Sequence, residues 1–237
     1  DEKLKVLKAL RPINSSNVAD KTVRGQYVGG FVAGKEVPGY LDEPDANQKS
    51  RTESFVAIKA EIDNWRWAGV PFYLRTGKRL PTKASEIVIY FKRQPHNLFG
   101  DSFASLPPNK LVIRLQPEEG VEVTVMNKVP GLTSSGSMDL QKSKLDLSFS
   151  EEFSDTRIAD AYEKLLLEVM IGNQALFVRR DEVEQAWRYA DSIIEAWSAT
   201  NEGPESYQAG TWGPVSSIGL LAREGRSWYE SKIKRRK

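Results

Sequence analysis

The stretch KLVIRLQPEEGVEVTVMNKV, residues 110–129, decides the fold class of this chain. Both halves are rich in β-branched residues, which is typical of strands. The EEG at 118–120 between them predicts a hairpin turn, and two strands joined by so short a turn must run antiparallel. The stretch therefore predicts an antiparallel sheet at the centre of the fold.

Further strands flank this hairpin along the sequence. They are rich in β-branched and aromatic residues, are bounded by turn signals, and span residues 54–63, 85–92 and 143–150. In 54–63, aromatic Phe55 shares its face with the charged Lys59 and Glu61. The alternation in this strand therefore leaves open whether the outer face of the sheet is covered or solvated.

After residue 150 the apolar period becomes that of a helix. Residues 158–172 predict a helix that ends at Gly172, where a left-handed cap fits. Asp181 predicts the N-cap of the next helix, with Glu184 completing a capping-box-like pair. An apolar stripe runs along that helix, made of Val183, Ala186, Trp187, Ala190, Ile193, Ile194 and Trp197.

The order of these elements predicts the architecture. A helix within residues 3–10 precedes the strands, and a short helix follows the Gly- and Pro-rich residues 203–214. Strands and helices follow each other in blocks, whereas a parallel Rossmann sheet needs them to alternate. We therefore predict an α+β fold: a large, mostly antiparallel sheet with helices packed on one side, treated as one domain over residues 1–237.

Composition excludes several classes of protein. The chain has 237 residues, of which 40% are hydrophobic and 28% charged, as in ordinary globular proteins. A net charge of +2 gives no global attraction to nucleic acid or a membrane surface. With no cysteine, disulfides, thiol catalysis and zinc–thiolate sites are excluded. No apolar run reaches the ~20 residues of a membrane span, and the first ten residues do not have the pattern of a signal peptide. We expect a cytoplasmic protein without nucleic-acid or membrane partners.

Two patterns resemble functional sites only in part. GGFVAGKE at 29–36 has the glycine spacing and lysine of a phosphate loop. However, Glu36 stands where a Mg²⁺-binding hydroxyl belongs, and it would repel phosphates. His96, the only histidine, has no acidic or hydroxyl partner nearby in the sequence, which favours a loop residue over a catalytic base. Adjacent carboxylates favour solvated surface at Asp42, Glu43, Asp45, Glu118, Glu119, Glu151 and Glu152. We predict no catalytic residue and no metal site.

The segment PFYLRTGKRLPTK, residues 71–83, is the one candidate binding site. FYLR predicts a buried strand, and Lys78 and Lys83 follow on a turn. Two ammonium groups on a rigid turn could converge on one phosphate group through charge-assisted hydrogen bonds. Gly77 lacks a Cβ where a ligand or another backbone could approach closely. The residues alone leave a solvated basic hairpin as the other interpretation.

This segment belongs to a longer resemblance. WRWAGVPFYLRTGKRLPTK, RGQYVGG, GYLDEP, VIRLQPEEGV, LDLSF, DAYEKLLLEVMIGNQALFVRRDEVEQAWR and WGP resemble the C-terminal domain of the glucose-6-phosphate dehydrogenases, in the same order and at similar spacing. The resemblance runs from residue 1 to about residue 229, and its pattern is similar to bacterial members. It also implies the block order of strands and helices described above.

The resemblance implies a substrate site and a reaction. The family oxidises glucose 6-phosphate to 6-phosphogluconolactone with NADP in the pentose phosphate pathway. Lys78 and Lys83 match two basic substrate-binding positions, and Gln116 matches a glutamine close to the sugar. The dinucleotide fingerprint, an R-I-D-H-Y motif and the catalytic histidine belong to an N-terminal domain that this chain lacks. The resemblance therefore implies a fragment that is inactive alone, and a homodimer formed through the sheet or an assembly with that missing domain.

A second, structural NADP binds this domain in animal members of the family. At the matching positions this chain has Ala84, Val88, Glu122, Thr124 and Trp212, while Arg75, Arg114 and Asp146 are kept. Most cations are lost and Glu122 is added, so we predict no NADP bound to this fragment. A non-catalytic assembly or regulatory domain is the alternative function, although such a domain has no need of Lys78, Lys83 and Gln116.

Overall fold

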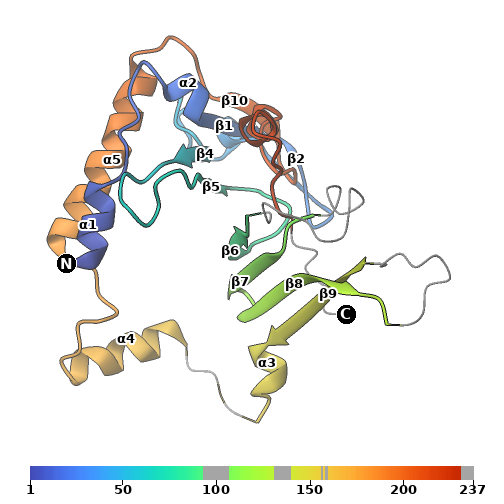
Figure 1. Cartoon of the computed structure of the whole chain (residues 1–237). Coiled ribbons are helices and arrows are strands. Elements are labelled where there is room, and N and C mark those ends of the chain that lie inside the picture. Colours follow the sequence, from blue (N-terminus) through green and yellow to red (C-terminus); the bar gives the residue numbers. More distant parts are fainter. Residues whose placement is uncertain (93–106, 131–139, 156, 158–159, 231–237) are drawn as a thin grey trace. The chain divides into compact units, whose positions relative to one another are not determined.

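The computed structural model describes residues 1–92, 107–130, 140–155, 157 and 160–230 (Figure 1). The chain divides into two compact units, and its treatment as one domain stays a prediction. The first unit comprises residues 1–82 and 171–237, and the second comprises residues 83–170. His96 lies outside the described residues.

The first unit is built on a mixed four-stranded sheet with the order β10-β1-β4-β5. The strands are β1 (Thr22–Val28), β4 (Phe55–Ala60), β5 (Phe72–Gly77) and β10 (Glu205–Gln208). β4 pairs antiparallel with β1 and β5, and β10 lies parallel to β1. This pairing brings a strand from the end of the chain beside one from its beginning.

Helices cover both faces of this sheet, whereas the sequence predicted helices on one side. On one face, Val56 and Ile58 of β4 pack against a cluster that includes Ile193 and Trp197 of α5 (Arg180–Ser198). Ile13 and Val18 complete that cluster, Val18 from α2 (Val18–Lys21). On the other face, Phe55 and Ala57 pack with Tyr207 and with Leu220 and Leu221 of α6 (Ser216–Ala222). The physical reason is that β4 is an inner strand with an unbroken apolar start, Phe55 to Ile58, so it buries both faces.

The segment that resembles a phosphate loop forms a β-hairpin instead. β2 (Gly30–Val32) pairs antiparallel with β3 (Lys35–Val37), and a 3₁₀ turn, η1 (Tyr40–Asp42), follows. Ala33 and Gly34 at its tip have φ of 52° and 80°, as a type I′ hairpin turn requires. β3 was not among the strands predicted from the sequence, because it is only three residues long and lies between Gly34 and Pro38.

Two helices lie side by side in the first unit: α1 (Glu2–Lys8) and α5. The predicted capping of α5 is shifted. The helix begins at Arg180, and the backbone N–H of Arg179 donates to Oε2 of Glu182 at 3.1 Å. Glu184 instead accepts a hydrogen bond from Arg180 one turn away, at 2.8 Å. The prediction that Asp181 is the N-cap is therefore wrong by two residues, because Glu182 is the carboxylate that reaches back.

The second unit contains a four-stranded sheet of order β6-β7-β8-β9, antiparallel throughout. Its elements are β6 (Ser85–Tyr90), β7 (Lys110–Gln116), β8 (Gly120–Lys128), β9 (Leu140–Ser148), α3 (Phe149–Glu152) and α4 (Ala161–Met170). The predicted hairpin around residues 118–120 is confirmed, and Gly172 after α4 has the expected positive φ, 72°. The α+β class is confirmed. The strands, however, divide between two four-stranded sheets and a hairpin.

Candidate substrate-binding site

Lys78 stands on a loop whose backbone is held on both sides. β5 ends at Gly77, and the next residue, Lys78, donates its backbone N–H to the carbonyl of Ser54 at 2.8 Å. Its own carbonyl accepts a hydrogen bond from the Tyr207 hydroxyl at 2.7 Å. The Lys78 side chain itself is exposed. The fold therefore fixes the backbone from which the ammonium group extends into solvent.

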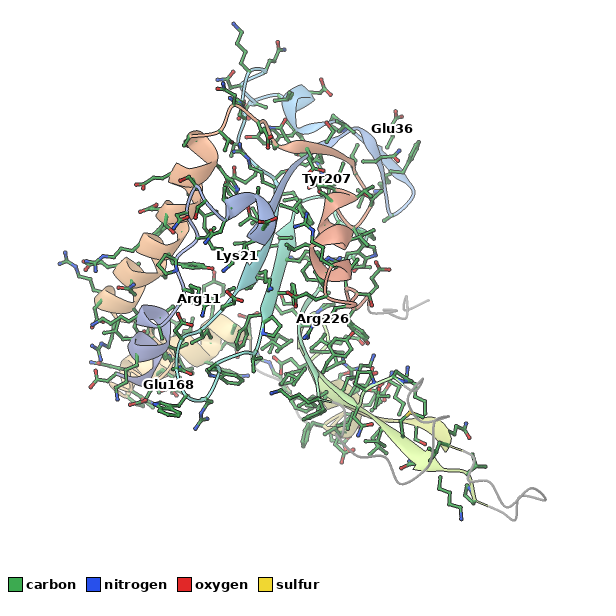
Figure 2. The ribbon with its side chains drawn as sticks, turned by 45° about the horizontal axis from the view of Figure 1, so that its top comes forward. Arg11, Lys21, Glu36, Glu168, Tyr207 and Arg226 are labelled. Carbon is green, nitrogen blue, oxygen red and sulfur yellow. The ribbon has the colours of Figure 1, made fainter. Side chains whose placement is uncertain are left out.

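Tyr207, labelled in Figure 2, links this loop to the core of the first unit. Its side chain is 4% exposed and packs against the rings of Phe55 and Tyr27. Burial raises the pKa of the Tyr207 hydroxyl, so it remains protonated and keeps donating at neutral pH. Tyr207 is 129 residues from Lys78, and no local pattern in the sequence pointed to it.

Arg79 and Glu43 hold the same loop from the other side. Arg79 has φ of 52° and donates to Oε1 of Glu43 at 2.8 Å, and the Tyr27 hydroxyl donates to the same carboxylate at 3.1 Å. The hydrogen bond from Arg79 lowers the pKa of Glu43. The backbone N–H of Gly210 donates to the Arg79 carbonyl at 2.7 Å. Glu43 was predicted to be solvated surface, whereas it anchors the loop.

Gly77 serves packing rather than ligand approach. A Cβ at this position would lie 2.9 Å from Cδ2 of Phe55 and 3.3 Å from Cδ2 of Leu80. Contacts this short would force the core to shift. The sequence left open a ligand or another backbone as the neighbour; the structure places the side chains of Phe55 and Leu80 there. FYLR forms the expected strand, but Leu74 within it is 53% exposed, so the strand is only partly buried.

Lys83 and Gln116 belong to the second unit and lie at the same end of its sheet. Gln116 is the last residue of β7 and pairs with Ser85, the first residue of β6. Lys83 precedes Ser85 by two residues, and both Lys83 and Gln116 are exposed. Lys78 belongs to the first unit. Convergence of Lys78 with Lys83 and Gln116 on one ligand stays a prediction.

Arg75 and Arg114, which match positions of the structural NADP site in animal members, each interact with side chains of their own unit. In the first unit, the guanidinium of Arg75 lies 4.6 Å from the ring centroids of both Trp212 and Trp228. In the second, Arg114 donates to Asp146 at 2.6 Å and lowers the pKa of that carboxyl.

Buried Glu122 adds a negative charge to the sheet of the second unit, where it pairs with Asp146 across β8 and β9. It is 6% exposed and lies 2.8 Å from Nζ of Lys144. The hydrogen bond to Glu122 raises the pKa of Lys144. Within the second unit, a dinucleotide phosphate would therefore meet this carboxylate and a guanidinium, Arg114, that already has a partner. The absence of a second NADP stays a prediction.

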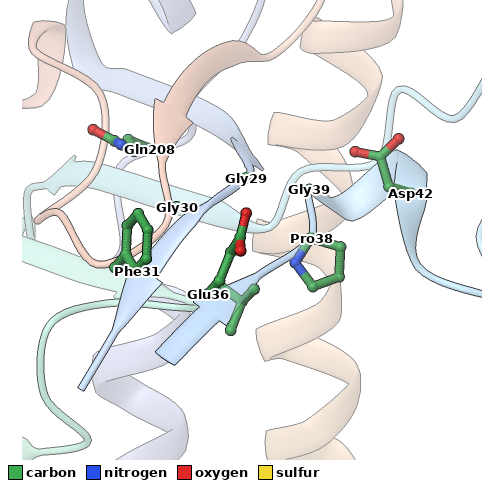
Figure 3. A pocket seen from close by; sticks show the side chains of 9 residues that line it. Gly29, Gly30, Phe31, Glu36, Pro38, Gly39, Asp42 and Gln208 are labelled. Carbon is green, nitrogen blue, oxygen red and sulfur yellow. The ribbon is translucent and has the colours of Figure 1, made fainter. Parts of the chain in front are cut away.

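The hairpin that resembles a phosphate loop lines a pocket of about 590 Å³ in the first unit (Figure 3). Glu36 and Asp42 place carboxylates at its wall, and Phe31 and Gln208 line it as well. Both charged side chains are negative, so the pocket is unsuited to a phosphate ligand. Within the described part of the chain, no helix combines the length and apolarity that crossing a membrane requires.

Comparison with known proteins gives a consistent result. The family model for the C-terminal domain of glucose-6-phosphate dehydrogenase matches residues 1–229. The chain is 63% identical to a glucose-6-phosphate 1-dehydrogenase of Dickeya dadantii, over 97% of this chain and 46% of the relative. It is 57% identical to that of Rhizobium meliloti, over 98% and 46%.

Solved structures agree with these relatives. A glucose-6-phosphate dehydrogenase in complex with its substrate glucose-6-phosphate superposes with a TM-score of 0.82 at 35% identity. That match covers 97% of this chain and 45% of the other. The enzyme from Mycobacterium avium gives 0.75 at 29% identity. The chain thus spans about half the length of its relatives, and it belongs to the family of glucose-6-phosphate dehydrogenase C-terminal domains.

Proposed function

We propose that this chain is the substrate-side part of a longer, bacterial-type glucose-6-phosphate dehydrogenase that acts in the cytoplasm. The longer enzyme oxidises glucose 6-phosphate to 6-phosphogluconolactone in the pentose phosphate pathway, and NADP accepts the hydride. The observation that carries the proposal is the Lys78 loop, because its backbone is held by Ser54 and Tyr207 while its ammonium group is exposed. The family match over residues 1–229 supports it.

The proposed role of the residues on this chain is to bind and orient the substrate. Lys78 and Lys83 would donate charge-assisted hydrogen bonds to the phosphate, and the amide of Gln116 would bond a sugar hydroxyl. Fixed ammonium groups suit a phosphate dianion because they need no proton transfer. Removal of the C1 hydroxyl proton and binding of the nicotinamide fall to the part outside residues 1–237. The chain alone is therefore proposed to bind no NADP and to be inactive.

A chimera tests this proposal. In it, residues 1–237 replace the matching part of the Dickeya dadantii relative, which is 63% identical. Removing one charged hydrogen bond costs about 1.5–3 kcal/mol, so Lys78→Gln should lower kcat/KM for glucose 6-phosphate by roughly 10- to 100-fold. Lys35→Gln, an exposed lysine on β3, is the matched control and should leave kcat/KM unchanged. An active chimera that tolerates Lys78→Gln would contradict the proposed role of Lys78.

A homodimer through the β6–β9 sheet is part of the proposal. Support comes from apolar side chains on β6 and β9 that are exposed in this unit: Ile87 at 49%, Ile89 at 41%, Leu145 at 65% and Leu147 at 43%. Apolar surface of this extent is usually covered by a partner element or chain. Sedimentation equilibrium of the chimera should give twice the mass of one chain, and a monomer at micromolar concentration would remove this part of the proposal.

A further inference from the structure

An open apolar groove lies between α1 and α5 in the first unit, where Figure 1 shows the two helices alongside each other. The groove holds about 640 Å³. Its apolar wall comes from both helices and includes Val6, Leu7, Val183, Ala186, Trp187 and Ala190. Val183 is 41% exposed and Trp187 is 60% exposed, so the wall is open to solvent.

The groove arises because only half of the apolar stripe on α5 is used within the unit. Ile193 and Trp197, in the C-terminal half, are buried against β4. The N-terminal half lies beside α1, to which it is joined by an ion pair of 2.6 Å between Arg179 and Asp1. α1 supplies a second wall, but Trp187 remains mostly uncovered. An apolar stripe along a helix is normally buried over its whole length. Nothing in the described part of the chain covers Trp187 fully, so its half of the stripe is available to a partner.

The lining identifies the kind of partner. A small-molecule site of this volume needs several polar groups that converge to orient the ligand. Among the described residues that line the groove, the charged ones are Lys3 and Glu182, and the Glu182 carboxylate accepts the N–H of Arg179. The walls are two neighbouring helices, and Ala186 and Ala190 allow another backbone to approach closely. This shape fits an amphipathic helix that inserts apolar side chains at helical spacing.

The source of that helix follows from lengths and charges. The relatives are about twice as long as this chain, so a longer polypeptide has ample residues to supply it. A helix from elsewhere in the polypeptide can place a carboxylate opposite Lys3. A second copy of this chain is the alternative occupant, and the dependence of labelling on concentration, described below, tests it.

We propose that the α1–α5 groove is the seat of an amphipathic helix from the part of the longer polypeptide outside residues 1–237. The inference rests on the proposed function, which makes this chain one part of such a polypeptide. The helix covers Trp187 and Val183 and joins the two parts of the enzyme, so that the N-terminal half of α5 is buried only in the longer protein.

Site-specific labelling tests the proposal, since this chain contains no cysteine. Ala186→Cys places a thiol in the groove, and Arg188→Cys, two residues along α5 and exposed, places the control thiol on the opposite side of the helix. Both variants are made in the 237-residue chain and in the Dickeya chimera, and maleimide labelling is read at each position by peptide mass. We expect labelling at position 186 to be slower in the chimera by roughly tenfold or more, because a buried site reacts only when it opens. Labelling at position 188 should be equal in both.

Two outcomes would overturn the proposal. Equal labelling at position 186 in both proteins means that the groove stays open in the longer polypeptide. Labelling that slows in the 237-residue chain as its concentration rises means that a second copy fills the groove. Oxidation of glucose 6-phosphate by the same chimera reports on the proposed function separately. An active chimera with an open groove rejects the helix and keeps the function.

Discussion

The hydroxyl of Tyr207 ties the proposed substrate lysine to the core. Tyr207→Phe removes the hydrogen bond to the Lys78 carbonyl and leaves that acceptor without it. We expect a loss of about 1–2 kcal/mol in the free energy of unfolding. In the chimera we expect KM for glucose 6-phosphate to rise more than kcat falls, because a loosened loop binds the phosphate less well. Urea unfolding and steady-state kinetics measure the two effects.

Tyr162→Phe, at an exposed position on α4, is the matched control for this substitution. It should change neither stability nor KM. If Tyr207→Phe lowers stability but leaves KM unchanged, then Tyr207 supports the fold without positioning Lys78.

Tyr73 gives the first unit a pH dependence on the alkaline side. Its hydroxyl donates to Glu224 at 2.7 Å, and burial together with that carboxylate raises its pKa to about 12 from a model-peptide value of 10.0. The folded state therefore binds the proton more tightly than the unfolded state. Stability is fully present below pH 10 and is lost as pH rises from 10 toward 12.

Denaturant unfolding across this pH range checks the expectation. Tyr73→Phe removes the titrating hydroxyl, so its stability should fall less steeply with pH than that of the unaltered chain. Parallel pH profiles for the two proteins would show that Tyr73 does not titrate with a raised pKa.

At the scale of elements, the sequence predicted which strands and helices exist better than it predicted what packs against them. Strands and helices with strong local periodicity were found, including the hairpin of β7 and β8 and the helix α5. The cap of α5 was misplaced, because several acidic residues near its start compete for the same backbone N–H group. β3 was missed because its three residues lie between turn-forming Gly and Pro. Helices on both faces of β4 depend on α6, more than 150 residues away, and no local pattern reports such a contact.

In the candidate site, too, the sequence predicted residues of a local motif but not the distant residues that pack against them. Lys78, Lys83 and Gln116 were named from motifs, whereas Tyr207 and Glu43 were not. The lysines lie in one contiguous segment with a recognisable family pattern. The residues that hold the Lys78 loop come from distant parts of the chain, and their roles depend on strand pairing that the sequence does not reveal. β10 reaches the sheet as a parallel neighbour of β1, a pairing that only the fold discloses.

On β8, Glu122 is the buried centre of a charged group. Glu122→Ala leaves Lys144 without its 2.8 Å partner and empties space beside β7 and β9. Because Lys144 is 51% exposed, water compensates for part of the loss, and we expect about 1–2 kcal/mol of destabilisation. Thermal unfolding measures it. Glu119→Ala, in the exposed turn between β7 and β8, is the control and should be near neutral. Equal effects of the two substitutions would contradict a structural role for Glu122.

The same strand bears on cofactors. Glu122 stands near Arg114 and Asp146, which already pair with each other, so a pyrophosphate would face a carboxylate and an engaged cation. We expect isothermal titration calorimetry of the 237-residue chain with NADP to give no binding at micromolar concentration. A micromolar Kd would show that these residues rearrange to accept a dinucleotide.

At the scale of the whole molecule, the proposed function divides the enzyme's chemistry between two parts of one polypeptide. We propose that this chain supplies phosphate-binding cations on the Lys78 loop and an open groove that seats a helix from the rest of the polypeptide. Under the proposed function neither part is complete alone, because the proton acceptor and the nicotinamide site belong to the rest of the longer enzyme.

Formation of NADPH from glucose 6-phosphate and NADP, followed by absorbance, tests this division most directly. The account predicts no turnover by the 237-residue chain, turnover by the Dickeya chimera, and a kcat/KM lower by roughly 10- to 100-fold in the chimera with Lys78→Gln. Turnover by the 237-residue chain alone, or full activity of the chimera without Lys78, would contradict it.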